Sequence, residues 1–142
     1  VMSATMLTGD ERHPGGVRPV KDSADFITVA RDNVVLDAGF GLLTNAIVDQ
    51  HFVRRRRHNR LMSVVLERPE HLGVGIDEST ALIVEPSGRW RVAGESVAIV
   101  YDARHATITP TGQTLGETGM VMQILPAGSR YDPRTGVARL PD

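Results

Sequence analysis

Short apolar runs separated by turn-forming residues make up much of the sequence after its first third. NVVLDAG (33–39) and AIVD (46–49) have the composition of short, buried strands. The segment 71–103 continues with further apolar runs that are broken by a PSGR turn, and its residues 97–101 alternate in size. MVMQILP (120–126) adds one more apolar strand, followed by a DPRTG turn. The pattern predicts that this part of the chain is rich in strands.

One helix is expected between the strands. Leu61, Val64 and Val65 recur at helical spacing, Asn59 is a good N-cap residue, and Pro69 stops the element. The spacing predicts a helix of about ten residues. The basic run 54–57 then lies in the loop or first turn before the helix, where cationic side chains oppose the helix dipole.

The first part of the chain has a different character. VMSATM (1–6) resembles the apolar start of a helix already in progress. GDERHPGGVRPVKDSAD (9–25) collects glycines, prolines and charges without any periodicity, which predicts a long surface loop.

Composition narrows the possible functions. The 142 residues with 41% hydrophobic content suit one domain with a core, and 16 basic against 17 acidic residues give a net charge of -1. No cysteine is present, which excludes a disulfide framework, a thiolate nucleophile and a Cys-based zinc site. No apolar run reaches the roughly 18 residues of a membrane helix. The histidines are scattered and form no HExxH motif, so we expect no metal; they are His13, His51, His58, His71 and His105. The chain has no Walker A or GxGxxG motif, so we expect no nucleotide cofactor.

The run VRRRRHNR (53–60) raises three possibilities: a nucleic-acid arm, a solvated face, or part of an active site. Only 4% of the residues are aromatic, which argues against nucleic acid. The run follows a strand end that carries His51, which could act as a general base if a carboxylate orients it. Asp77 and Glu78 end another apparent strand and could supply that carboxylate, although both could equally be turn residues.

A longer combination of motifs is more specific than any of these pieces. GFGLLTNAIVDQHFVRRRRHNRLMSVVLERPEHLGVGIDESTALIVE (39–85) resembles the cyanophycinase-like serine peptidases, a family that includes aspartyl dipeptidase. The resemblance rests on DQHF, on arginines four, six and nine residues after the histidine, and on GVGIDESTA. Arg54 and Arg56 match nothing in the family's pattern.

The resemblance implies a three-layer α/β sandwich like that of class I glutamine amidotransferases, of which residues 1–142 would form the C-terminal half within a single domain. It implies a Ser-His-Glu triad in which His51 is the base and Glu78 the acid. It also implies that five further residues line or support the substrate pocket: Asp49, Gln50, Arg55, Arg57 and Arg60.

The family's serine stands in a G-x-S-A-G-A turn directly before a segment like VMSATM, so we expect the nucleophile upstream of Val1, with Ser3 structural. The expected function is a serine-type exopeptidase that hydrolyses aspartyl bonds, converting cyanophycin to β-Asp-Arg dipeptides. An aspartyl dipeptidase and a non-catalytic peptide-binding subunit are the alternatives. Expected partners are a peptide substrate, a missing N-terminal segment or companion chain, and a second copy in a homo-oligomer such as a dimer. We expect no nucleic acid or membrane partner, and a cytoplasmic location.

Overall fold

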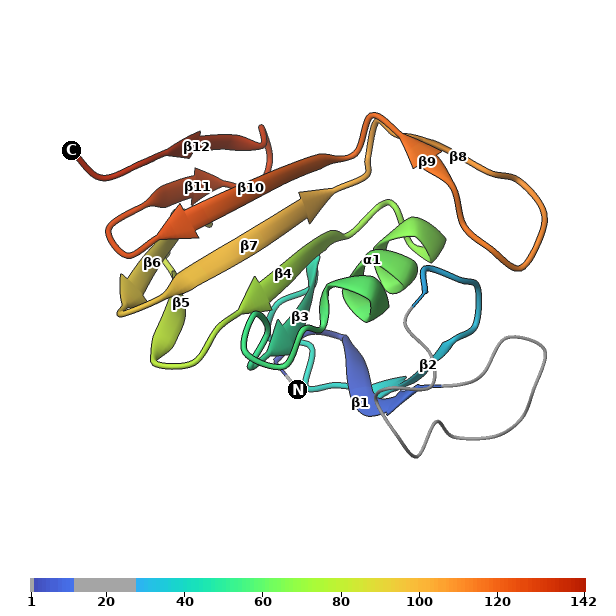
Figure 1. Cartoon of the computed structure of the whole chain (residues 1–142). Coiled ribbons are helices and arrows are strands. Elements are labelled where there is room, and N and C mark those ends of the chain that lie inside the picture. The colour runs from blue at the N-terminus through green and yellow to red at the C-terminus, as the bar shows by residue number, and fades with distance from the viewer. Residues whose placement is uncertain (1, 12–27) are drawn as a thin grey trace.

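The computed structural model describes residues 2–11 and 28–142, and in this part of the chain it contains one helix and twelve strands (Figure 1). The helix is α1 (His58–Glu67). The strands are β1 (Thr5–Glu11), β2 (Val34–Ala38), β3 (Ala46–Gln50), β4 (Leu72–Ile76), β5 (Thr80–Val84), β6 (Trp90–Gly94), β7 (Val97–Asp102), β8 (Thr107–Ile108), β9 (Glu117–Thr118), β10 (Val121–Pro126), β11 (Arg130–Asp132) and β12 (Val137–Arg139). No helix in these residues is long and apolar enough to cross a membrane.

Two four-stranded sheets form the body of the molecule. The main sheet has the strand order β10-β7-β4-β3, and the small sheet has the order β12-β11-β6-β5. Within the described residues the pairing of β3 with β4 is parallel, whereas every other strand pair is antiparallel. The fold is therefore mixed α/β with mostly strands, rather than a largely parallel sheet flanked by helices.

The main sheet lies between α1 and the small sheet (Figure 1). Ile99 and Tyr101 of β7 pack with Leu61 and Val65 of the helix in one core cluster. The intervening Ala98 and Val100 belong to a second cluster on the opposite face of the sheet, together with Trp90 and Val92 of the small sheet. Because both faces of β7 are covered, the side chains on both of its faces are buried or partly buried.

Two glycines of β4 let its neighbours approach the strand closely. A Cβ at Gly73 would lie 2.4 Å from a methyl of Val65, and one at Gly75 would lie 2.1 Å from the ring of Phe52. Both glycines face the helix layer, whereas Leu72 and Val74 face the small sheet. The GVG sequence is thus needed for close packing against a helix and an aromatic ring.

Strands β2, β3, β4, β5, β6, β7 and β10 and helix α1 confirm the elements predicted from the apolar pattern. The prediction that Asn59 caps the helix is wrong. Arg57 is the N-cap residue and makes no side-chain capping bond. The preceding turn runs directly into the helix, because the Arg57 N–H bonds to the Phe52 carbonyl and the Leu61 N–H to the Arg57 carbonyl. Asn59 therefore lies inside the first helical turn.

The expectation of a helix at VMSATM is also wrong. Ser3 forms an isolated parallel bridge with Leu43, and the chain continues into strand β1 from Thr5. The Ala4 N–H bonds to the Leu43 carbonyl at 3.3 Å and the Leu43 N–H to the Met2 carbonyl at 3.1 Å, so an extended neighbour satisfies this backbone. Residues 9–11 of the predicted loop belong to β1, and the rest of that loop, to 25, lies outside the described residues.

We predict that Gly75→Ala lowers the free energy of unfolding by about 1–3 kcal/mol, the usual cost of overpacking a core. The added methyl would occupy the position of the Phe52 ring, which must then move. Urea denaturation followed by circular dichroism measures the change. Gly116→Ala is the control, since its Cβ would meet only the Thr109 methyl, at 3.1 Å. Equal losses in the two variants would contradict the close contact at Gly75.

Candidate active site

The parallel pairing of β3 with β4 brings two carboxyl-terminal strand ends together. Gln50 is the last residue of β3 and pairs with Ile76, the last residue of β4. His51 follows the first strand directly, and Asp77 and Glu78 follow the second. His51 and Glu78, which are 27 positions apart in sequence, therefore meet at the carboxyl ends of two adjacent strands, as expected for parallel pairing.

A sharp turn holds His51 at the end of β3. Its backbone has a positive φ of 53°, which is uncommon for a residue other than glycine. The next residue, Phe52, is fully buried, and its N–H bonds to the Ile76 carbonyl at 3.3 Å. Since the Phe52 ring lies against Gly75, the DQHF and GVGIDE motifs are physically one unit. The buried ring fixes the point from which the histidine projects.

His51 and Glu78 contact each other directly. His51 Nδ1 lies 3.2 Å from Glu78 Oε1, and the two side chains are 46% and 38% exposed. Arg54 Nε lies 3.2 Å from Glu78 Oε2, so one carboxylate joins the histidine to an arginine. A histidine that donates its Nδ1 proton to a carboxylate presents Nε2 as a proton acceptor. This arrangement has the geometry of a general base with an orienting acid.

Asp77 has a different task from Glu78. Its Oδ1 accepts the backbone N–H groups of Val53 and Arg54, each at 3.1 Å, and its Oδ2 accepts the Ser96 hydroxyl at 2.8 Å. Burial raises the pKa of the Asp77 carboxyl, but these hydrogen bonds outweigh it and hold the pKa below its ordinary 3.8. Asp77 therefore anchors the turn that carries His51, a role that the motif alone does not reveal.

Asp49 and Arg60 form a buried ion pair. Arg60 on α1 donates its Nε to Asp49 Oδ2 at 2.7 Å and a terminal nitrogen to Oδ1 at 2.5 Å. Both side chains are nearly inaccessible, at 4% and 2% exposed. Arg57 adds a longer contact to the same carboxylate at 3.5 Å and donates to the Gln50 carbonyl at 2.6 Å. The pair joins the helix to the end of β3 with a two-pronged contact that suits the planar guanidinium.

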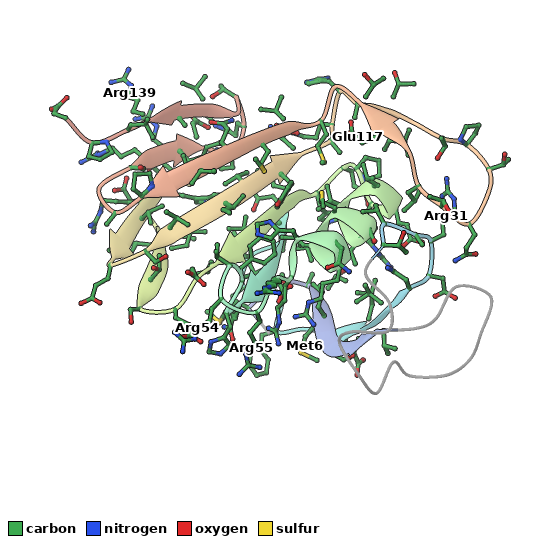
Figure 2. All side chains as sticks on the ribbon, viewed as in Figure 1. Met6, Arg31, Arg54, Arg55, Glu117 and Arg139 are labelled. Atoms are coloured by element: carbon green, nitrogen blue, oxygen red, sulfur yellow. The ribbon has the colours of Figure 1, made fainter. Side chains whose placement is uncertain are left out.

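A pocket of about 180 Å³ opens beside these residues. Four of the five residues that the family resemblance assigns to a pocket line it, and β1 and β3 add apolar and hydroxyl groups. The full lining is Leu7, Thr8, Val48, Asp49, Gln50, Arg57 and Arg60. The fifth, Arg55, is exposed and does not line it. Figure 2 shows Arg54 and Arg55 projecting from the loop, away from the sheet.

Ser3 does not join the site. Its side chain is fully buried, and its hydroxyl donates to the Thr5 carbonyl at 2.6 Å. The same oxygen lies 3.5 Å from the backbone nitrogen of Val48. These contacts agree with a structural serine, although it lies in extended chain rather than in a helix.

Behind the turn, a pair missed by the sequence reading supports Phe52. His58 Nδ1 lies 2.6 Å from the Tyr101 hydroxyl, and the His58 and Phe52 rings are 4.6 Å apart. Burial raises the pKa of Tyr101 to about 12, so its hydroxyl stays protonated at neutral pH and shares this hydrogen bond with the imidazole. The sequence feature that could have revealed this pair is a tyrosine at a core position, because a buried phenol usually has a hydrogen-bond partner.

Across residues 2–11 and 28–142, no three histidine or acidic side chains cluster as metal ligands.

Comparisons with known proteins identify similar sequences. No protein-family model matches the chain. The cyanophycinase of Synechococcus elongatus is 36% identical over 110 residues, which make up 74% of this chain and 34% of that protein. The cyanophycinase of Trichormus variabilis is 35% identical over 73% of this chain and 37% of its own length, and that of Geminocystis herdmanii is 33% identical over 68% and 38%. The chain spans roughly a third of the length of these curated relatives.

We predict a pH-dependent contribution of Asp77 to stability. A carboxyl whose pKa is lowered by folding stabilises the protein above its unfolded value, here 3.8, and this contribution disappears as the pH falls through the folded pKa. The difference in unfolding free energy between the wild type and Asp77→Asn should be largest near neutral pH and shrink below about pH 4.

Chemical denaturation between neutral pH and about pH 2 measures this difference. Asp142→Asn is the control, because this residue is exposed at the end of the chain and its replacement should change stability by less than about 0.5 kcal/mol. A difference for Asp77→Asn that stays constant over the whole pH range would contradict the assigned hydrogen bonds.

Proposed function

The chain belongs to the cyanophycinase-like family, and from that premise we propose that it supplies the histidine and acid of a serine-peptidase site that degrades cyanophycin. The observation that carries the proposal is the contact of 3.2 Å between His51 Nδ1 and Glu78 Oε1 at the ends of two adjacent parallel strands. The curated relatives are named cyanophycinases, which supports a peptidase acting on that polymer.

In the proposed mechanism, a serine hydroxyl attacks the carbonyl carbon of an aspartyl peptide bond. His51 Nε2 takes the hydroxyl proton and then donates it to the departing amine, which leaves an acyl-enzyme. Water then attacks the ester, with His51 again as the base, and releases the acid and the free serine. Glu78 keeps the imidazole in the required tautomer and stabilises its positive charge.

We propose that the serine comes from a segment preceding Val1 or from a companion chain. Strand β3 offers a place for such a segment, since it is an edge strand of the main sheet in the described residues. An added strand there would complete a three-layer α/β sandwich of the kind found in class I glutamine amidotransferases, with the present residues as its C-terminal half. A homodimer is a further proposed level of assembly.

The pocket residues divide into two proposed roles. Arg57, whose side chain is 20% exposed, and Gln50 line the pocket and can bind the carboxylate and amide groups of an aspartyl substrate. Arg60 is buried against Asp49, so it acts by holding Asp49 and the end of β3 in place. Arg55 is exposed on the loop and can reach a substrate that extends beyond the pocket.

We predict that His51→Ala, made in the protein together with the source of its serine, lowers kcat by about 10⁴-fold or more. The loss follows because the serine then has no base to accept its proton. Release of β-Asp-Arg from cyanophycin measures the rate. His105→Ala, which changes an exposed histidine away from the turn, is the control and should retain nearly full activity.

Near-normal turnover by His51→Ala would contradict the proposed mechanism. If the wild type cleaves Asp-X dipeptides but not cyanophycin, the mechanism stands and the substrate assignment is wrong. A protein with its serine in place that binds peptides without cleaving them would instead be a non-catalytic subunit.

A further inference from the structure

The outer face of the small sheet carries a row of arginines. In this sheet, Arg130 of β11 pairs with Arg91 of β6 on one side and with Arg139 of β12 on the other. The adjacent residues Trp90 and Tyr131 point into the core and are each 1% exposed. Because side chains alternate along a strand, the arginines project to the opposite, outward face. Figure 2 shows Arg139 extending from the outermost strand of this sheet.

This row places like charges side by side. Directly opposite residues on neighbouring strands have Cβ atoms about 5 Å apart, and like charges at that distance destabilise a sheet. Arg91 has a weak partner, with its Nε 3.9 Å from Glu85 Oε1. Within the described residues, neither Arg130 nor Arg139 has a carboxylate within 4.0 Å. An anion bound across the row would remove the repulsion.

The same face is hollowed. A cavity of about 320 Å³ lies over β6, β11 and β12. Most of its lining is charged or polar, and the full set is Glu85, Arg89, Trp90, Arg130, Tyr131, Asp132, Thr135, Val137 and Arg139. The Asp132 carboxylate already has two cationic neighbours, Arg89 Nε at 3.6 Å and an Arg134 terminal nitrogen at 3.4 Å. Arg130 and Arg139 therefore remain as the cationic groups available to a ligand in the cavity.

The surroundings favour carboxylates over nucleic acid. Guanidinium groups bind carboxylates through two parallel hydrogen bonds, and a row of them suits a chain with acidic groups at intervals. A single-stranded nucleic acid would need exposed aromatic side chains on which its bases stack, but Trp90 and Tyr131, which contribute to the cavity wall, are each only 1% exposed.

We propose that the row Arg91, Arg130 and Arg139, with the cavity beside it, is a binding site for an acidic peptide, which it holds through the peptide's carboxylates. The site is separate from His51 and Glu78. Glu78 precedes β5 at the end where Thr80 pairs with Gly94, whereas the arginine row crosses the sheet further along, where Ile83 pairs with Arg91. The proposal concerns binding alone, so it stands independently of the proposed peptidase activity.

Fluorescence anisotropy with a fluorescein-labelled peptide of ten aspartates tests the site in the complete chain. We expect Arg130→Gln/Arg139→Gln to weaken binding by about ten-fold at low salt, and each single variant by about three-fold, as typical for exposed ion pairs. Arg68→Gln is the matched control, since it removes the same charge from an exposed position at the end of α1 and should change the dissociation constant less than two-fold. Far-UV circular dichroism checks that each variant keeps the wild-type fold.

Unchanged peptide binding by the folded double variant would overturn the proposal. A loss of binding in Arg54→Gln/Arg56→Gln that equals or exceeds the loss in the row variant would also overturn it, because the peptide would then occupy the loop beside His51. An oligonucleotide of equal charge that binds more tightly than the peptide, and that the row variants release, would replace the carboxylate ligand with a phosphate one.

Discussion

The parallel pairing of β3 with β4 is the constraint on which the candidate site depends. It aligns Asp49 with Gly75 and Gln50 with Ile76, so that both strands end at the same level. His51 and Glu78, which follow these ends, can then meet although they come from different motifs. A shift of one residue in this register would turn every side chain of one strand to the opposite face and separate the pair.

Three kinds of contact hold that register. On the helix face, Gly73 and Gly75 admit Val65 and Phe52 so closely that a side chain at either position would collide with them. At the strand end, the buried pair of Asp49 with Arg60 joins β3 to the helix. Asp77 then fixes the turn after His51 through two backbone N–H groups. Removing one partner from such a buried ion pair typically lowers the free energy of unfolding by several kcal/mol. The contacts that position the candidate site are therefore also contacts that stabilise the fold.

The apolar pattern predicted most of the strands and the helix, because buried strands such as 46–50 and 97–102 have few competing interpretations. It failed at VMSATM, where pairing with the segment before β3 outweighs local helical preference. It also missed β11 and β12, which are only three residues each and are specified by their partners rather than by their own composition. The contact of His51 with Glu78 was expected from the family's motifs, whereas the anchoring role of Asp77 depends on backbone geometry that no motif encodes.

The proposed mechanism requires His51 and Glu78 to act as one catalytic unit. A double-mutant cycle on kcat/KM with cyanophycin, in the protein that includes the nucleophilic serine, tests this coupling directly. Residues that work as a unit lose their joint contribution when either is removed. We therefore expect His51→Ala/Glu78→Ala to be no slower than His51→Ala alone, within about three-fold. Losses that multiply in the double variant, or a Glu78→Ala variant with full activity, would contradict the account.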